Sequence, residues 1–178
     1  DYLRAMGLAG EYAYAGREWV VAKIVNDILK TQIVESIHNH HNFCWRETHF
    51  GERYWVVRKG ATPAFPGQRG FVGGSMGDDA YIVEGIDSEE SVKSLYSTVH
   101  VAGRVMSRTQ ANGKYDRIVN NKIRRDGLVR HDDMLKWIQE KGVVLRGADV
   151  DESPQAYRRL NEVLKFHAGT TKVIKTLH

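Results

Sequence analysis

The sequence predicts a mixed α/β fold of the α+β kind, with mixed sheets flanked by helices. Three observations support this prediction. Apolar residues recur at roughly helical spacing over residues 1–30. Runs rich in β-branched and aromatic residues follow at 33–37 and 54–57. Further helical patterns and a last β-rich run, residues 173–177, lie in the final third of the chain.

Composition and charge are those of an ordinary globular protein. The 178 residues are enough for one domain with a core, and 42% of them are hydrophobic. The formal charge of +4 fits an acidic partner such as RNA without requiring one. Cys44 is the only cysteine, so no disulfide can form within the chain. No apolar run approaches the ~20 residues of a membrane span, and we expect a cytoplasmic protein with no membrane partner.

The N-terminal part is expected to run from helix to hairpin. Residues 1–30 have a helical pattern that Gly16 could divide into two helices, and we interpret this element as packing. The runs 33–37 and 54–57 predict strands. Gly51 lies between two extended runs and predicts a hairpin turn. Farther along the chain, Ser88, followed by Glu89 and Glu90, predicts the cap of a short turn.

The C-terminal part is expected to alternate polar segments with short elements. Residues 112–130 are polar and basic and are interpreted as a solvated loop. Residues 131–141 predict a helix with Met134, Leu135 and Ile138 inward, and 143–145 predict a strand. Ser153-Pro154 is typical of a helix start, with the serine as N-cap and the proline in the first turn. The buried face of this helix would be Tyr157, Leu160, Val163 and Leu164.

A group of histidines precedes the predicted hairpin turn. His38, His40, His41 and Cys44 suggest a zinc site, but there is no second pair at zinc-finger spacing. On an extended strand His38 and His40 would share a face, and His41 would point the other way. We therefore interpret His38 and His40 as surface or loop residues and Cys44 as a packing residue. A plain metal-binding or interaction module centred on these histidines stays open as an alternative.

Residues 58–108 hold the richest chemistry of the chain. Five glycines fall between Gly67 and Gly77, and glycine leaves backbone N–H groups accessible to an anion. Arginine and lysine side chains at both ends of the stretch offer donors to phosphate oxygens. His100 is the one side chain there that can be a neutral nucleophile near pH 7. The stretch predicts a phosphate site with a histidine in it, although turns and a solvated basic face would have the same composition.

The motifs resemble those of the RtcB family of RNA-splicing ligases. The resemblance covers the whole chain in order and implies that residues 1–178 are one unit, the C-terminal part of that family's catalytic domain. We therefore expect a piece of a longer chain. The motifs that carry the resemblance are His41-Asn42-Phe43, Arg58-Lys59-Gly60-Ala61-Thr62, Gly74-Ser75-Met76-Gly77, the block from His100 to Arg108, the opening Asp1 to Met6 and the later Asp151 to Tyr157.

The resemblance implies a role for each matched residue. His100 would attack the α-phosphate of GTP and give a histidine–GMP adduct, and His41 would bind Mn²⁺. Lys59, Arg104 and Arg108 would stabilise phosphate charge, the two arginines from one face of a helix if residues 102–110 are helical. The nucleotide contacts would be Asn42, Gly73, Gly74, Ser75, Met76, His100, Val101, Ala102 and Gly103.

The implied reaction joins RNA ends that carry a 2′,3′-cyclic phosphate or a 3′-phosphate to ends that carry a 5′-hydroxyl, as in tRNA splicing and RNA repair. Two positions depart from the family pattern. Ala80 replaces a usual serine and loses about 1 kcal/mol of hydrogen bonding. Val101 replaces a usual glycine, and a β-branched residue at a positive φ would cost about 1–2 kcal/mol. A degenerate protein that binds nucleotide or RNA without ligating is therefore the alternative function.

Overall fold

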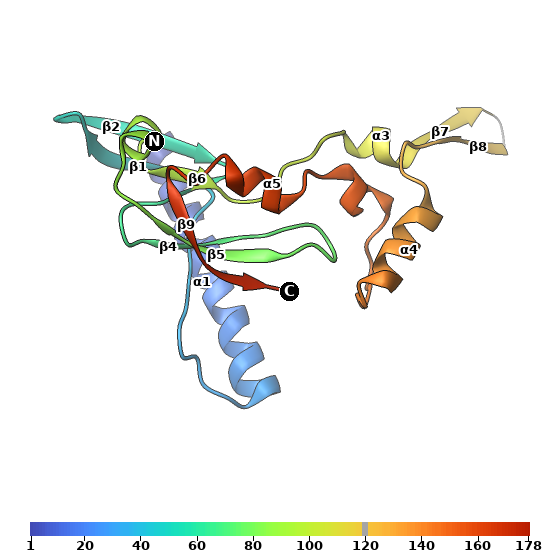
Figure 1. Cartoon of the computed structure of the whole chain (residues 1–178), viewed down its shortest axis with the longest axis horizontal. Helices are drawn as coiled ribbons and strands as arrows, with labels where there is room; N and C mark the ends of the chain where they lie inside the picture. The colour runs from blue at the N-terminus through green and yellow to red at the C-terminus, as the bar shows by residue number, and fades with distance from the viewer. Residues whose placement is uncertain (119–120) are drawn as a thin grey trace. The chain divides into compact units, whose positions relative to one another are not determined.

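A computed structural model describes residues 1–118 and 121–178, and for residues 114–118 and 121–125 it describes the backbone alone. The basic side chains expected at 114–125 therefore lie outside the described residues. Contacts divide the chain, drawn in Figure 1, into two compact units that are treated separately below. The first unit holds Asp1–Phe71, Glu84–His100 and Gly169–Lys172, and the second holds Val72–Val83, Val101–Ala168 and Val173–His178.

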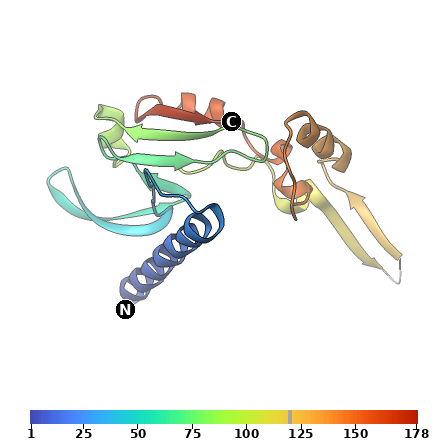
Figure 2. The same cartoon turned by 90° about the horizontal axis from the view of Figure 1, so that it is seen from below.

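The N-terminal segment forms one long helix, α1 (Tyr2–Lys23), which Figure 2 shows as unbroken. The expected division at Gly16 is wrong, because α1 runs through that residue. A π-helical turn, η1 (Ile24–Leu29), continues the helix. Gly10 is buried in α1, and an added Cβ there would overlap the ring of Phe43. Glycine therefore lets the Phe43 ring pack directly on the helix backbone.

The first unit continues with an antiparallel hairpin, β1 (Asn42–His49) and β2 (Glu52–Lys59). Its turn contains Gly51 with φ +80°, a region that glycine adopts without strain. The predicted turn and the strand at 54–57 are confirmed. The strand predicted at 33–37 is wrong, since that segment has no strand. Strand propensity is realised only where a partner and a half-buried face exist, and β1 supplies both for β2.

Short elements then lead to His100. Strand β3 (Ala61–Pro63) pairs antiparallel with β6 (Ser97–Val99), which ends one residue before His100. Helix α2 (Glu89–Lys93) begins at Ser88, whose hydroxyl accepts from a backbone N–H in the first turn, as predicted. Strands β4 (Arg69–Val72), β5 (Ala80–Gly85) and β9 (Thr171–Leu177) form a three-stranded sheet in the order β4-β5-β9. Strand β9 confirms the strand predicted at the end of the chain.

The second unit contains helix α3 (Arg108–Asn112) and a hairpin of β7 (Gly113–Ile118) and β8 (Asn121–Asp126). The expectation of a loop over 112–130 is therefore wrong for the backbone of these strands. The condition under which Arg104 and Arg108 would share a helix face is not met, because Ser107 caps α3 and the helix starts at Arg108.

The core of the second unit gathers around helix α4 (His131–Glu140), which confirms the predicted helix. Met134 and Ile138 are buried as predicted, whereas Leu135 is exposed, so its predicted inward position is wrong. No strand forms at 143–145, contrary to prediction. The buried core residues are Ala111, Val129, Met134, Ile138, Val150 and Ala156.

The segment from Ser153 forms short helical turns rather than one helix. Pro154 begins a 3₁₀ turn, η3 (Pro154–Ala156), after another at η2 (Val150–Glu152). Helix α5 (Leu160–Lys165) starts only after an extended Tyr157, so the predicted start was correct and the predicted continuity was wrong. The mixed α+β class is confirmed. Among the helices of residues 1–118 and 121–178, none combines the length and apolarity needed to cross a membrane.

Candidate functional site

The two histidines with predicted roles meet within the first unit. The rings of His41 and His100 lie parallel, with centroids 3.9 Å apart and planes tilted by 5°. His41 precedes β1 and His100 follows β6, so the fold joins segments that are distant in sequence. The predicted metal ligand thus lies directly against the predicted nucleophile.

His100 is held in a form suited to nucleophilic attack. Burial lowers the pKa of His100, and the charge of His41 lowers that pKa further. The imidazole therefore stays neutral near pH 7, which is its nucleophilic form. Its Nδ1 atom is buried and has no hydrogen-bond partner in the part of the chain that the structure describes. Nδ1 is therefore a ring nitrogen that none of the described residues occupies.

The turn after β2 is tied to the segment that carries His41. The Gly60 N–H donates to the His41 carbonyl at 2.7 Å and to Asn42 Oδ1 at 2.9 Å. Gly60 has φ +67°, which favours glycine. Asn42 and Lys59 are paired in the hairpin register, and the Lys59 side chain is exposed. The Asn42 oxygen therefore fixes this turn, which leaves its NH₂ group for a ligand.

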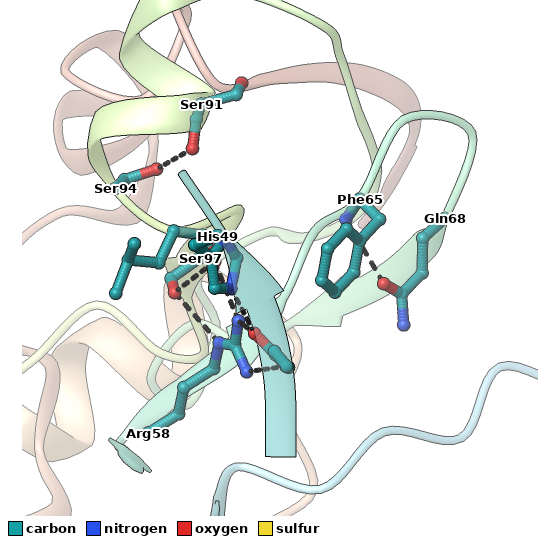
Figure 3. A network of polar contacts seen from close by, with 9 residues as sticks. His49, Arg58, Phe65, Gln68, Ser91, Ser94 and Ser97 are labelled. Atoms are coloured by element: carbon teal, nitrogen blue, oxygen red, sulfur yellow. Dashed lines mark hydrogen bonds and ion pairs between the residues drawn. The ribbon is translucent and has the colours of Figure 1, made fainter. Parts of the chain in front are cut away.

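Arg58, next to Lys59 in the same motif, has a different place. It is 3% exposed and donates to both carboxylate oxygens of Glu47, at 2.7 and 2.9 Å. It also donates to Ser97 Oγ and to the Leu95 carbonyl, both at 2.8 Å. Figure 3 shows this network, in which His49 contacts the same carboxylate. Arg58 thus links the hairpin to the turn and strand that lead to His100.

Glu47 is ionised more readily than a free carboxyl group. Burial raises the pKa of Glu47, but hydrogen bonds from Arg58 and His49, together with their charges, outweigh burial, and the net pKa is lowered. The folded state therefore holds the carboxylate form more strongly than the unfolded state does.

We expect this carboxylate to make stability depend on pH. Its contribution is full above the ordinary pKa of about 4.3 and is lost as the pH falls through the lowered value, because the unfolded state takes up the proton first. Denaturant unfolding of the parent and of Glu47→Gln, compared from about pH 3 to pH 7, should show a stability gap that narrows on acidification. A gap that stays constant with pH would contradict the assignment.

The second unit brings two of the predicted nucleotide-binding segments together, whereas Asn42 and His100 belong to the first unit. A cavity of about 530 Å³ is lined by both the Gly73–Met76 segment and Val101-Ala102. Gly73 and Val101 form a parallel backbone bridge, and Ser75 Oγ donates to the Glu152 carbonyl at 3.1 Å. Gly103 does not line this cavity; it has φ +77°.

Other cavity residues were missed by the sequence reasoning. Tyr157 was expected only on the buried face of a helix, and the 143–145 segment was expected to be a strand. The motif from Asp151 to Tyr157 was recognised, but no role was attached to it. The additional lining residues are Val143, Val144, Leu145, Arg146, Ala148, Glu152 and Tyr157.

Arg104 and Arg108 lie close to acidic residues rather than on one helix face. Arg108 Nη1 is 2.6 Å from carboxylate oxygens of both Asp151 and Glu152. Arg104 Nη1 donates to the Tyr157 hydroxyl at 2.8 Å, and the guanidinium lies 4.8 Å from the ring centroid. Arg104 Nη2 is buried without a hydrogen-bond partner among the described residues. Arg104 therefore retains a free donor, whereas the charge of Arg108 is balanced by carboxylates.

The chain does not assemble a complete metal site from its own described residues. Among them, no group of three or more His, Cys, Asp or Glu side chains could hold a metal ion. The His38 ring stacks on Tyr14 at 3.6 Å and accepts from Arg17 Nε at 2.6 Å, so His38 faces α1. Cys44 is buried, which confirms that it packs. His41 remains as a single imidazole that a metal could share.

Comparisons with known proteins give consistent matches. A family model described as "tRNA-splicing ligase RtcB" matches residues 1–178. The RNA-splicing ligase RtcB of Escherichia coli strain K12 is 35% identical over 99% of this chain and 42% of its own length. The tRNA-splicing ligase RtcB of Nanoarchaeum equitans strain Kin4-M is 26% identical over 98% of this chain and 40% of its own length. The chain thus spans less than half the length of these relatives.

Proposed function

This chain belongs to the RtcB family, and from that premise we propose that it is part of a GTP- and manganese-dependent RNA ligase. The ligase would join 2′,3′-cyclic phosphate or 3′-phosphate ends to 5′-hydroxyl ends. The parallel stack of His41 on His100 carries the proposal. The activity is proposed for the full-length protein, in the cytoplasm, with the two units as parts of one catalytic domain.

A ring nitrogen of His100 is proposed to attack the α-phosphorus of GTP. The new N–P bond forms as the bond to the bridging oxygen of the β-phosphate breaks, and pyrophosphate leaves. An oxygen of the RNA 3′-phosphate then attacks the histidine–GMP adduct, takes the GMP group and releases His100. The 5′-hydroxyl attacks the activated 3′-phosphorus, loses its proton and displaces GMP. A cyclic phosphate is first opened by water.

The cavity of the second unit is proposed to hold the nucleotide. Its volume of about 530 Å³ lies within the usual ~300–1,000 Å³ of ligand pockets. An added Cβ at Gly74 would lie 2.5 Å from the Asp79 carbonyl oxygen, so only glycine keeps the backbone of this wall in place. Val101 lines the cavity and is the next residue after His100. Arg104 Nη2 and Arg108 are the proposed donors to phosphate charge within this unit, and Lys59 is a proposed donor within the first unit.

Mn²⁺ would be held in part by His41, with its other ligands supplied from outside the described residues. The ion would neutralise charge on phosphate oxygens. The described residues supply a nucleophile, donors to phosphate and the cavity walls.

Incubating the full-length protein with Mn²⁺ and α-labelled GTP tests this function. A ligase of this kind gives a protein-bound, acid-labile label and releases pyrophosphate. GTP and Mn²⁺ binding without a label would instead support the second candidate, a degenerate family member that binds without ligating. The departures at Ala80 and Val101 favour that second candidate.

Val101 gives a prediction of its own. The structure removes the expected backbone penalty, because Val101 does not have a positive φ. Its side chain still lines the proposed nucleotide cavity. Val101→Gly is therefore expected to tighten GTP binding about tenfold, because it removes an isopropyl group that crowds the cavity, where even one methylene is worth ~1–3 kcal/mol.

Rates of adduct formation at several GTP concentrations would measure this effect. Val105→Gly is the matched control, because Val105 is an exposed valine of the same unit that does not line the cavity. Equal rates of adduct formation for Val101→Gly and the parent would show that the Val101 side chain does not weaken GTP binding.

A further inference from the structure

One face of the β1–β2 hairpin carries charge of a single sign. Side chains alternate along a strand, so every second residue of β2 shares this face with the residues paired opposite on β1. The acidic residues of both strands, Glu47 and Glu52, lie on the other face. We name the exposed cationic and apolar side chains the basic hairpin face: Arg46, Arg53, Trp55, Val57 and Lys59.

Within the first unit, the side chains of the basic hairpin face are exposed to a binding partner. Trp55 is 53% exposed and Val57 is 71% exposed. The three cations are exposed, and none of them forms an ion pair with another described residue. Arg46 lies opposite Trp55 in the register, with its guanidinium 5.9 Å from the ring centroid. This contact restrains both groups before any partner binds.

The face leads along the hairpin toward the candidate site. Lys59 is the last residue of β2 and pairs with Asn42, which follows His41. Residues on one face of a strand repeat about every 6.6 Å, so Arg53, Trp55, Val57 and Lys59 form a row that ends beside the His41 segment. An extended polymer bound along this row would reach the segment that carries His41.

We propose that the basic hairpin face is a docking surface for the single-stranded RNA segment next to the reacting end. This inference rests on the proposed function, because it takes RNA as the substrate. Three unpaired cations without a carboxylate complement a polyanion. Trp55 supplies a flat ring on which a base stacks, and stacking tolerates any sequence. Arg46 and Arg53 contact phosphates on either side of that base.

The test measures binding of a labelled single-stranded RNA of about 12 nucleotides with a 3′-phosphate to the full-length protein without GTP. Trp55→Ala is expected to weaken binding about tenfold or more, because the stacking ring is lost. Trp55→Phe keeps a ring and should retain most of the affinity. A plot of log binding constant against log salt concentration has a negative slope, and Arg46→Gln and Arg53→Gln should each make that slope less steep by about 0.7.

Two controls match these variants. Tyr54→Ala removes an exposed aromatic from the opposite face of the same strand. Lys136→Gln removes an exposed cation from α4. Both should bind RNA like the parent. If Trp55→Ala does not fold, Trp55→Phe and the two arginine variants still decide the question.

RNA affinity that is the same in the Trp55 and arginine variants as in the controls would overturn the proposal. Lowered unfolding midpoints with unchanged RNA affinity would do so too, and would indicate that protein covers this face. Formation of the GTP-derived label needs no RNA, so the label tests the ligase activity and the RNA-binding measurement tests the docking surface independently. Salt-dependent RNA binding that requires Trp55, without any GTP-derived label, would refute the proposed ligase activity. A GTP-derived label, together with RNA binding that the Trp55 and arginine substitutions leave unchanged, would refute the proposed docking surface.

Discussion

Replacing His100 by alanine is expected to reduce the GTP-derived label on the full-length protein by at least about a thousandfold. The N–P bond needs a neutral ring nitrogen, and the lowered pKa of His100 supplies one. We do not expect His41 to take over, because its imidazole is the proposed metal ligand. Acid-labile incorporation of label from α-labelled GTP, measured with Mn²⁺ present, gives the comparison.

His38→Ala is the matched control for this prediction. His38 lies in the segment that carries His41, but it stacks on Tyr14 and accepts from Arg17, so it lies against α1. We expect this variant to incorporate label like the parent. Label that persists in His100→Ala would show that another residue is the nucleophile, and the reading of the histidine stack would then be wrong.

Replacing Arg58 by methionine is expected to lower the free energy of unfolding by about 3–5 kcal/mol, because it leaves the Glu47 carboxylate in the protein interior without its cation. The change also removes the donors to Ser97 Oγ and to the Leu95 carbonyl. Leu95 has φ 53°, an uncommon backbone region for a residue other than glycine. The turn that leads to His100 therefore loses its anchor together with the ion pair.

Denaturant unfolding of the parent and the variant measures this loss. Arg69→Met is the matched control: Arg69 pairs with Glu35 on the surface, where an ion pair contributes only ~0–1 kcal/mol. The double variant Arg58→Met with Glu47→Met should recover much of the loss, because a well-packed apolar pair can replace a buried ion pair. A similar cost for Arg58→Met and Arg69→Met would refute the structural role of Arg58.

Elements defined by local signals could be predicted from the sequence. The helical periodicity of α1 and α4, the glycine at the hairpin turn and the cap at Ser88 each act within a few residues. The strands expected at 33–37 and 143–145 failed, because an apolar β-branched run becomes a strand only when a neighbouring strand accepts its hydrogen bonds.

The candidate site shows the same division. His41 and His100 could be singled out from their motifs, but their parallel contact depends on β1 and β6 being placed together by the fold. The sequence grouped Arg58 with Lys59, although one is buried in an ion pair and the other is exposed. Tyr157 and Glu152 were missed as cavity residues because cavity walls come from segments that no local pattern connects.

The single buried thiol gives the hairpin a built-in reporter. Cys44 is 6% exposed in β1, so an alkylating reagent can reach it only when the hairpin opens. When reclosing outpaces alkylation, the labelling rate measures the equilibrium between closed and open hairpin. Cys44 is the only cysteine of residues 1–178, so within them the signal belongs to one position. If RNA or GTP, added during the labelling, slows alkylation of Cys44, that ligand stabilises the closed hairpin. The labelling rates with and without the ligand measure this effect.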